Sequence, residues 1–245
     1  MTKYGGHRTV TADGAMLSDP AGLGNVMEGE PEAAFDPMYW AARGELIEVA
    51  AGRGSAWFVS RSGCWVLRHY RRGGWIARLS RDRYCWTGET RVRAFAEYRL
   101  LEELVRGGLP VPKPVAARYR RTGLTYRCDL ITERIAGTRP LSSALTSGPL
   151  NDRTWRAIGA AIARLHAAGA DHADLNAHNI LVGEDGAVSV IDFDRGVLRK
   201  DKEKSGLWAA DNLSRLHRSL LKISRDLPPD RFSAAAWDRL LSGYG

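Results

Sequence analysis

The sequence has few cysteines and no long apolar run, and both absences limit what the protein can be. Its three cysteines, Cys64, Cys85 and Cys128, are odd in number and never stand at metal-ligand spacing, so neither a disulfide framework nor a zinc site is supported. No stretch approaches the roughly 18 apolar residues that span a bilayer, and residues 1–14 lack the apolar core of a signal peptide. These features predict a cytoplasmic protein that can meet a membrane only at its surface.

Lysine is also scarce, and none occurs between Tyr4 and Pro112. Of the 36 basic residues 30 are arginines, and against 28 acidic residues they give a formal net charge of +8. Residues 61–127 carry 16 basic and 5 acidic side chains, so this segment has a charge of +11 while the rest sums to −3. Such asymmetry indicates an anionic partner, which can be nucleic acid, a membrane surface or a phosphorylated substrate. A codon bias toward arginine is the alternative explanation.

The composition is that of a folded protein, because 44% apolar and 26% charged residues exclude a disordered chain. The length fits one large domain or two lobes. Residues 1–34 show no clear periodicity and form a poorly defined N-terminal segment, either a loose leader or a short edge element. Asp36 and Pro37 then mark the start of a short helix, as its N-cap and first-turn residue.

Residues 35–135 have the pattern of an antiparallel sheet with one helix. Extended runs separated by glycine-containing turns predict strands over residues 46–49, 57–59, 64–69, 115–119 and 124–135. An apolar stripe predicts the helix over residues 91–106. Residues 136–140 mark a lobe boundary, and residues 136–245 are mostly helical around a hairpin over residues 180–191. The fold class is therefore α+β, with a sheet lobe followed by a mostly helical lobe.

The most informative stretch is His172-Ala173-Asp174-Leu175-Asn176-Ala177-His178-Asn179, followed after a hairpin by Asp192-Phe193-Asp194. This spacing places Asp174 and Asn179 on one loop and Asp192 at a strand end facing them. Magnesium prefers hard oxygen ligands, which Asn179 and Asp192 supply, and Asp174 can accept or orient the proton of an attacking hydroxyl. The set therefore suits phosphoryl transfer. Two turn-forming Asx clusters would explain either motif, but not both in register.

The joint pattern resembles the H-R-D-L-x-x-x-N and D-F-G signatures of the protein-kinase-like superfamily, which implies a bilobal protein-kinase-like fold. In that superfamily the residue at the place of His172 braces the loop from behind. Arg68 stands where the superfamily has a phosphate-pairing lysine, and a guanidinium can pair with phosphate as a fixed fork. The turn that would cover the nucleotide phosphates consists of Gly52, Arg53, Gly54 and Ser55.

Glu97 lies on the inward stripe of the predicted helix, between Ala94 and Leu101, where a carboxylate is costly without a cation. Arg68 is its natural partner, and an amphipathic rim position is the alternative. Glu133 and Ile135 fall at the predicted hinge, where backbone groups would meet adenine.

Only 51 residues follow Asp194, no A-P-E motif is present, and Asp194 replaces the glycine of D-F-G. These departures favour a compact kinase of a small molecule or glycolipid over a phosphorylation-gated protein kinase. Three strings narrow the resemblance further, namely Trp65–Gly74, His172–Leu181 and Ile191–Gly196. They are similar to those of the Kdo (3-deoxy-D-manno-octulosonic acid) kinases within the lipopolysaccharide core kinase family, over about residues 35–225.

This resemblance implies ATP-dependent phosphorylation of the Kdo 4-hydroxyl on a Kdo-bearing lipid A precursor, in lipopolysaccharide inner-core biosynthesis. Asp174 would be the catalytic base, Asn179 and Asp192 would bind Mg²⁺, and Arg68 with Glu97 would hold ATP. The alternatives are a kinase of another small molecule or core sugar, such as a heptose or an aminoglycoside-like acceptor, and a pseudokinase scaffold. A nucleic-acid-binding protein would explain the positive net charge. The sequence contains no recognition-helix module, however, so no nucleic acid partner is expected.

The resemblance also explains the basic segment, because it implies a peripheral enzyme at the cytoplasmic face of the bacterial inner membrane. An anionic surface attracts Lys and Arg by ~1 kcal/mol each. The residues expected to dock the enzyme on it are Arg71, Arg72, Arg78, Arg81 and Arg83, helped by Arg199, Lys200, Lys202 and Lys204.

Overall fold

The computed structural model describes residues 6–19, 23, 30–50, 56–60, 64–71, 82–199 and 205–245. The chain forms two compact units, the first from residues 1–102 and 113–134 and the second from residues 103–112 and 135–245. The chain crosses between the units three times. The crossings lie within α2 (Arg93–Arg106), just before β7 (Pro114–Thr122) and just after β8 (Thr125–Glu133).

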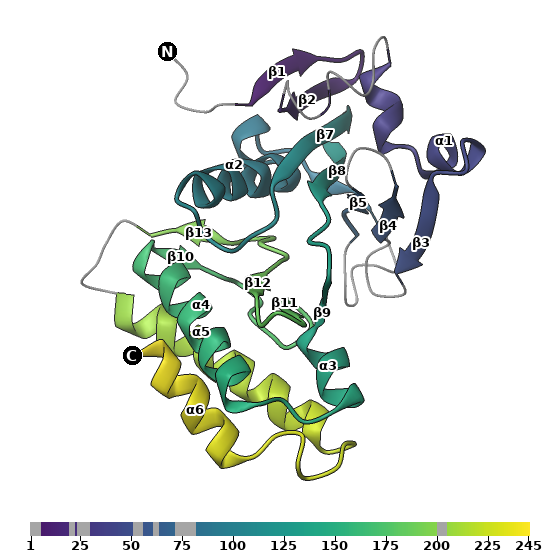
Figure 1. Ribbon diagram of the computed structural model, residues 1–245. Helices are drawn as coiled ribbons and strands as arrows, with labels where there is room; N and C mark the ends of the chain where they lie inside the picture. Colours follow the sequence, from purple (N-terminus) through teal and green to yellow (C-terminus); the bar gives the residue numbers. More distant parts are fainter. Residues whose placement is uncertain are drawn as a thin grey trace. The chain divides into compact units, whose positions relative to one another are not determined.

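The first unit is built on an antiparallel sheet (Figure 1). Its strands run in the order β1-β2-β7-β8-β5-β4-β3, and β6 (Tyr84–Cys85) pairs with β8. The strands not yet defined are β1 (His7–Val10), β2 (Gly14–Ser18), β3 (Leu46–Ala50), β4 (Ala56–Val59) and β5 (Trp65–His69). The 3-10 turn η5 (Glu89–Arg91) leads into α2. The strands and the helix predicted within residues 46–135 are confirmed, with small differences at their ends.

The hairpin of β1 and β2 lies in a segment whose sequence has no clear periodicity. β2 pairs with β7 from Gly14 opposite Arg120 to Ser18 opposite Ala116. Its central residues Ala15, Met16 and Leu17 are at most 5% exposed. A strand buried on both faces lacks the alternation of polar and apolar residues that reveals a half-buried strand. The structure therefore confirms the second alternative for residues 7–18, an edge element of the sheet, although the sequence pattern did not show where its strands lie.

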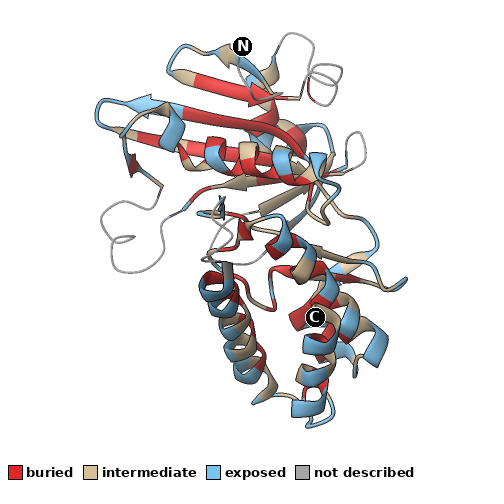
Figure 2. Ribbon diagram, turned by 90° about the vertical axis from the view of Figure 1, so that its left-hand side faces the viewer, coloured by how far each residue is buried: buried red, intermediate tan, exposed pale blue. Residues whose placement is uncertain are grey.

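Both faces of this sheet are covered. On one face α2 packs against β7, and the ring centroids of Phe95 and Tyr119 are 5.2 Å apart. The other face carries η2 (Pro31–Phe35) and α1 (Pro37–Ala42), and Trp40 of α1 packs edge-on against Trp65 at 5.8 Å. Asp36 caps α1 by accepting from the Met38 N–H at 2.9 Å, as its sequence position predicts. In Figure 2 buried residues accordingly run along the central strands.

The second unit is mostly helical, and its two small sheets carry the loops described below. Its helices are α3 (Leu141–Ser147), α4 (Asp152–Ala167), α5 (Ser205–Ser224) and α6 (Ala234–Tyr244). One sheet has the strand order β12-β11-β9, and β10 pairs with β13 in the other. These strands are β9 (Thr138–Pro140), β10 (Ala170–Asp171), β11 (Ile180–Gly183), β12 (Val188–Val190) and β13 (Val197–Leu198).

Helices α4 and α6 lie side by side in close contact (Figure 1). A Cβ on Gly159 would collide with the Leu240 carbonyl, and one on Gly243 would collide with the Arg156 carbonyl, so both glycines permit this close approach. Asn151 caps α4 by accepting from the Thr154 N–H at 2.8 Å. Among the described residues, no helix combines the length and the apolar character needed to cross a bilayer.

Candidate active site

The second unit holds the loop from His172 to Asn179, which joins β10 to β11. The start of the loop is anchored on α5, because the His172 N–H donates to Asn212 Oδ1 at 2.9 Å. Asn212 Nδ2 in turn donates to Asp171 Oδ1 at 2.9 Å and to the Trp208 carbonyl at 2.8 Å. Asn212 is only 1% exposed. A buried amide bonded through both of its ends fixes the chain where the loop begins.

The imidazole of His172 uses both ring nitrogens. The Asp174 N–H donates to Nδ1 at 3.1 Å, so the ring proton is on Nε2, which donates to the Ile191 carbonyl at 3.0 Å. Burial lowers the pKa of His172, which favours the neutral ring that this arrangement requires. The ring also packs against Phe193 with centroids 4.7 Å apart. His172 therefore ties the loop of Asp174 to the chain on both sides of Asp192, which is the bracing role that the resemblance implies.

Asp174 and Asn179 are held together through the backbone of Asp174. The Asp174 carbonyl accepts from Asn176 Nδ2 at 3.0 Å and from Asn179 Nδ2 at 2.9 Å. Because Asn179 Nδ2 is committed to this bond, the amide oxygen is the atom of that side chain that can ligate a metal. The main-chain carbonyl of Asn179 accepts from the Ile191 N–H at 2.9 Å. Asn179 is 9% exposed, whereas Asp174 is exposed and accessible to a substrate.

Asp192 follows β12 in an unusual backbone conformation. Its φ is +64°, in the left-handed region that residues other than glycine rarely adopt, although aspartate enters it more readily than most. The next residue, Phe193, is 1% exposed and packs against His172. The half-buried Asp192 thus stands directly after the residue that both His172 and Asn179 bind. Backbone strain of this kind concentrates at functional sites.

Asn179 and Asp192 carry oxygens of the kind that magnesium prefers. Magnesium usually takes one or two protein oxygens and completes its octahedron with water and phosphate oxygens. Within the described ranges, no group of three or more His, Cys, Asp and Glu side chains could hold a metal by itself. A metal at Asn179 and Asp192 would therefore rely on nucleotide phosphates for further ligands, as expected for a phosphoryl-transfer site.

In the first unit Arg68 of β5 meets Glu97 of α2. Arg68 Nη2 lies 2.5 Å from Glu97 Oε2, and the side chains are 22% and 2% exposed respectively. Arg68 faces α2, because it contacts Glu97 of that helix. Successive side chains of a strand point to opposite faces, so its neighbour His69, which pairs with Asp129, points away from α2. The ion pair thus has a buried carboxylate and a partly accessible guanidinium.

Tyr70 is a third member of this cluster and is not among the residues predicted from the sequence. Its hydroxyl donates to the same Glu97 Oε2 at 2.5 Å, and the Arg68 guanidinium carbon lies 4.6 Å from its ring centroid. The available signal was spacing, because residues two apart on a strand share a face. Asn212 was also missed, although an amide among the apolar positions of α5 indicates a buried hydrogen-bonding role.

The remaining residues predicted to contact ATP have mixed positions. Glu133 ends β8, where its N–H donates to the Lys113 carbonyl at 2.9 Å and its carboxylate lies 3.3 Å from Lys113 Nζ. The Ile135 carbonyl accepts from the Thr138 hydroxyl at 2.7 Å. These bonds do not bear on adenine recognition, which remains a prediction. Four residues lie outside the described ranges, namely Gly52, Arg53, Gly54 and Ser55.

The basic residues expected to face a membrane are also only partly described. Arg71, Arg83 and Arg199 are exposed, and Arg199 pairs with Asp171 at 2.8 Å. The other members of the set lie outside the described residues, namely Arg72, Arg78, Arg81, Lys200, Lys202 and Lys204.

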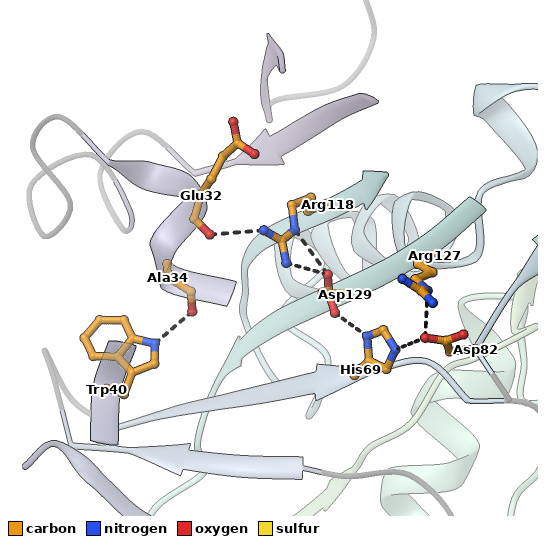
Figure 3. A network of polar contacts seen from close by, with 8 residues as sticks. All are labelled: Glu32, Ala34, Trp40, His69, Asp82, Arg118, Arg127 and Asp129. Carbon is orange, nitrogen blue, oxygen red and sulfur yellow. Dashed lines mark hydrogen bonds and ion pairs between the residues drawn. The ribbon is translucent and has the colours of Figure 1, made fainter. Parts of the chain in front are cut away.

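A second polar cluster lies on the face of the sheet opposite α2 (Figure 3). Asp129 Oδ2 accepts from Arg118 Nε at 3.1 Å and Nη2 at 2.9 Å, and Asp129 Oδ1 lies 2.6 Å from His69 Nδ1. Arg118 Nη1 also donates to the Glu32 carbonyl at 3.2 Å, which ties η2 to the sheet. His69 Nε2 lies 3.4 Å from Asp82. The hydrogen bond to Asp129 is the main cause that raises the pKa of His69.

A cavity of about 490 Å³ lies beside this cluster. Its walls include Phe35 of η2, Trp57 of β4, and the side chains of His69, Arg118 and Asp129. Because its strand residues point away from α2, the cavity is separate from the pair of Arg68 and Glu97.

Comparison with known proteins adds a family to this geometry. The model of the lipopolysaccharide kinase (Kdo/WaaP) family matches residues 38–244. A 3-deoxy-D-manno-octulosonic acid kinase of Xanthomonas axonopodis pv. citri (strain 306) is 52% identical over 191 residues, which are 77% of this chain and 74% of that protein. A 3-deoxy-D-manno-octulosonic acid kinase of Xylella fastidiosa (strain 9a5c) is 48% identical over 219 residues, which are 89% of this chain and 83% of that protein.

Proposed function

Because the chain belongs to the lipopolysaccharide kinase (Kdo/WaaP) family, and is thus a phosphotransferase acting on a hydroxyl group, we propose that its acceptor is Kdo. The enzyme transfers the γ-phosphoryl group of ATP to the 4-hydroxyl of Kdo on a Kdo-bearing lipid A precursor, a step in the synthesis of the inner core of lipopolysaccharide. One observation carries the choice of substrate. Relatives named 3-deoxy-D-manno-octulosonic acid kinase share 48–52% identity with this chain over 77–89% of its length.

Asp174 is the catalytic base in this proposal. Its exposed carboxylate stands on a loop whose backbone is fixed by His172, Asn176 and Asn179. A carboxylate held in this way orients the sugar hydroxyl toward the γ-phosphoryl group of ATP. It accepts the hydroxyl proton as the new P–O bond forms and the bond between the γ-phosphorus and the leaving ADP oxygen breaks. The contacts that fix the loop use backbone atoms of Asp174, so the carboxylate itself stays available for the substrate.

Asn179 and Asp192 are the residues that would hold magnesium, through the Asn179 amide oxygen and the Asp192 carboxylate. A metal held there would help neutralise the negative charge that develops on the phosphate oxygens during transfer. The bond from Asn179 Nδ2 to the Asp174 carbonyl orients the amide so that its oxygen can ligate the metal. Positioning and charge stabilisation, rather than covalent chemistry, are the main demands of phosphoryl transfer.

Arg68 binds ATP phosphates, and Glu97 holds Arg68. The 22% exposure of the Arg68 side chain supports this division of roles, because a ligand can reach the guanidinium while the carboxylate stays buried. A guanidinium offers a planar fork for phosphate oxygens. The turn of Gly52, Arg53, Gly54 and Ser55 covers the phosphates, and backbone groups of Glu133 and Ile135 meet adenine.

The enzyme works at the cytoplasmic face of the inner membrane, where its glycolipid substrate is inserted. The charge of +11 over residues 61–127 supports contact with an anionic surface. Exposed Arg71 and Arg83 belong to the basic set that would make this contact.

Incubation of the purified protein with Mg²⁺, γ-labelled ATP and a Kdo-bearing lipid A precursor tests the function. We expect label on the glycolipid, and none on the same lipid without Kdo. Asp174→Asn should reduce transfer by at least about a thousandfold while ATP binding remains, because the base is lost and the nucleotide contacts are kept. Asp226→Asn, which changes an exposed aspartate after α5, is the matched control. Absence of label on the Kdo-bearing lipid, or undiminished transfer by Asp174→Asn, contradicts the proposal.

A further inference from the structure

Tyr70 contacts both members of the pair that we propose to hold ATP. Its hydroxyl donates to Glu97 Oε2 at 2.5 Å, and its ring centroid is 4.6 Å from the Arg68 guanidinium carbon. Glu97 Oε2 also lies 2.5 Å from Arg68 Nη2, so one carboxylate oxygen joins the two donors. Each of the three side chains therefore contacts the other two.

The backbones of Arg68 and Tyr70 are both hydrogen-bonded to β8. Arg68 lies in β5 and pairs with Leu130 of β8, and the Tyr70 N–H donates to the Cys128 carbonyl at 3.1 Å, also in β8. The two side chains are therefore neighbours on the face of the sheet that meets α2. Glu97 comes from α2 to meet both of them.

Tyr70 and Glu97 are buried, whereas Arg68 is partly accessible to solvent. Tyr70 and Glu97 are each 3% exposed, while the Arg68 side chain is 22% exposed. The hydroxyl of Tyr70 is thus shielded from solvent and bound to a buried charge, which makes its hydrogen bond one of the stronger kinds. Of the three side chains, the Arg68 guanidinium is the one that an anionic ligand can reach.

An arginine at this position needs more orientation than a lysine. An ammonium is a compact point charge that a single carboxylate can hold, whereas a guanidinium is a plane whose direction decides which donors face the ligand. The Glu97 carboxylate fixes one end of that plane. The ring of Tyr70 adds a surface on which a guanidinium is attracted and oriented.

We propose that Tyr70 is a positioning residue for ATP, acting through Glu97 and Arg68. This inference rests on the proposed kinase function and goes beyond it by assigning a role that the superfamily signatures do not contain. Tyr70 touches no phosphate itself. It fixes the direction of the Arg68 guanidinium, so its effect on the reaction exists only while Arg68 is present.

The test is a double-mutant cycle of Tyr70→Phe and Arg68→Ala, read by ATP binding and by steady-state kinetics. Tyr70→Phe keeps the ring and removes the hydroxyl. We expect KM for ATP and Kd for ATP to rise about tenfold, the loss of one hydrogen bond to a charged group, with KM for the glycolipid unchanged. In the Arg68→Ala background the same substitution should change Kd for ATP by less than about twofold.

Tyr98→Phe is the matched control. Tyr98 is a fully buried tyrosine next to Glu97 on α2, and its hydroxyl has no hydrogen-bond partner among the described residues. It should leave every kinetic constant within about twofold of the wild type. The thermal midpoint of each variant is measured in parallel, because a residue with a merely structural role would lower the midpoint and leave KM for ATP of the folded protein unchanged.

The outcomes separate the two levels of inference. Wild-type activity with an unchanged KM for ATP in Tyr70→Phe overturns the role of Tyr70 and leaves the kinase function intact. An equal effect of Tyr70→Phe with and without Arg68 also overturns it, because action through Arg68 is then excluded. A wild-type protein that neither binds ATP nor labels the glycolipid overturns the function and this role together.

Discussion

On one face of the sheet in the first unit Arg68 meets Glu97, and on the other face Arg118 meets Asp129. Both carboxylates are buried, with residue exposures of 3% and 4%. The arginines differ, because the Arg68 side chain is 22% exposed and the Arg118 side chain is 9% exposed. Neighbouring residues of β5 supply one member to each cluster, since Arg68 faces α2 and His69 faces Asp129.

The difference lies in how far each cluster is closed. Both carboxylate oxygens of Asp129 have hydrogen-bond partners. Arg118 donates to Asp129 and also to the carbonyl of Glu32 in η2. Such a network joins parts of the protein to each other. In the other cluster the carboxylate is buried with Tyr70 while the arginine reaches solvent. The same pair of residue types therefore serves stability on one face and, in our proposal, ligand binding on the other.

Asp129→Ala should have the largest effect on stability. It leaves the buried Arg118 and the ring of His69 without their carboxylate, and breaking a buried ion pair such as that of Arg118 and Asp129 costs about 3–5 kcal/mol. Urea denaturation measures the loss, and KM for ATP of the folded protein should not change. Asp82→Ala is the control, because the Asp82 side chain is 27% exposed and should contribute about 1 kcal/mol or less. A loss of ATP affinity in Asp129→Ala would show that the two faces are coupled.

Arg68→Ala should reverse this profile. We expect kcat/KM for ATP to fall about a hundredfold, or about 3 kcal/mol of transition-state stabilisation, because a donor to phosphate is removed. The free energy of unfolding should fall less than in Asp129→Ala, since Glu97 keeps its bond from Tyr70. Arg118→Ala, compared in the same assays, should lose stability and keep KM for ATP. Equal losses of stability in the two arginine variants would remove the distinction between the faces.

His69 should make the stability of the first unit fall as the pH rises above about 6.5. Its pKa is raised, first by the hydrogen bond to Asp129, so its contribution is complete below the unfolded value of about 6.5. The contribution is lost as pH rises through the raised folded pKa. The facing charged groups are Asp82, Arg118, Arg127 and Asp129. We expect His69→Gln to flatten the fall in unfolding free energy above pH 6.5, and an unchanged slope would contradict a raised pKa of His69 in the folded protein.

The exposed pair of Arg8 and Glu89 should have the smallest effect. Arg8 donates to both carboxylate oxygens of Glu89 at 2.8 Å, but its side chain is 45% exposed. Surface pairs contribute about 0.2–1 kcal/mol even with good geometry, and salt screens them. Arg8→Ala should therefore lower the free energy of unfolding by less than about 1 kcal/mol in urea at low salt, and by still less in 1 M salt. A larger loss would mean that geometry counts for more than burial.

Short-range sequence signals predicted much of the fold. The caps at Asp36 and Asn151 need only a side-chain oxygen placed before a helical pattern, and both are present. The strands of residues 46–135 were also readable from their alternation and turns. The hairpin of β1 and β2 was not, because β2 is buried on both faces and has no alternation to read. Pairing between residues 14–18 and 116–120 is a long-range contact that local pattern does not encode.

For the candidate site, the structure confirms the predicted contact of Arg68 with Glu97, whereas the catalytic and binding roles stay predictions. The signature residues Asp174, Asn179 and Asp192 follow from spacing, and the contact of Arg68 with Glu97 follows from a carboxylate on an apolar stripe. The contact of Tyr70 with Glu97 was not predicted, because it joins residues that are 27 positions apart in the sequence. The left-handed backbone of Asp192 escaped because aspartate is compatible with many conformations.

In our proposal Arg68 takes the place that a lysine has in the kinase superfamily, and this has a chemical consequence for how the enzyme can be modified. Acyl transfer, whether by an acetyltransferase or by an acyl phosphate probe, requires an amine that can lose its proton, and a guanidinium, which stays protonated, does not supply one. Lys113 is the one lysine among the described residues of the first unit, and it is bound to Asp19 and Glu133. If Arg68 binds ATP phosphates as we propose, acetylation of this residue is not available as a switch, and a reagent that acylates nucleotide-site lysines would not react with its guanidinium.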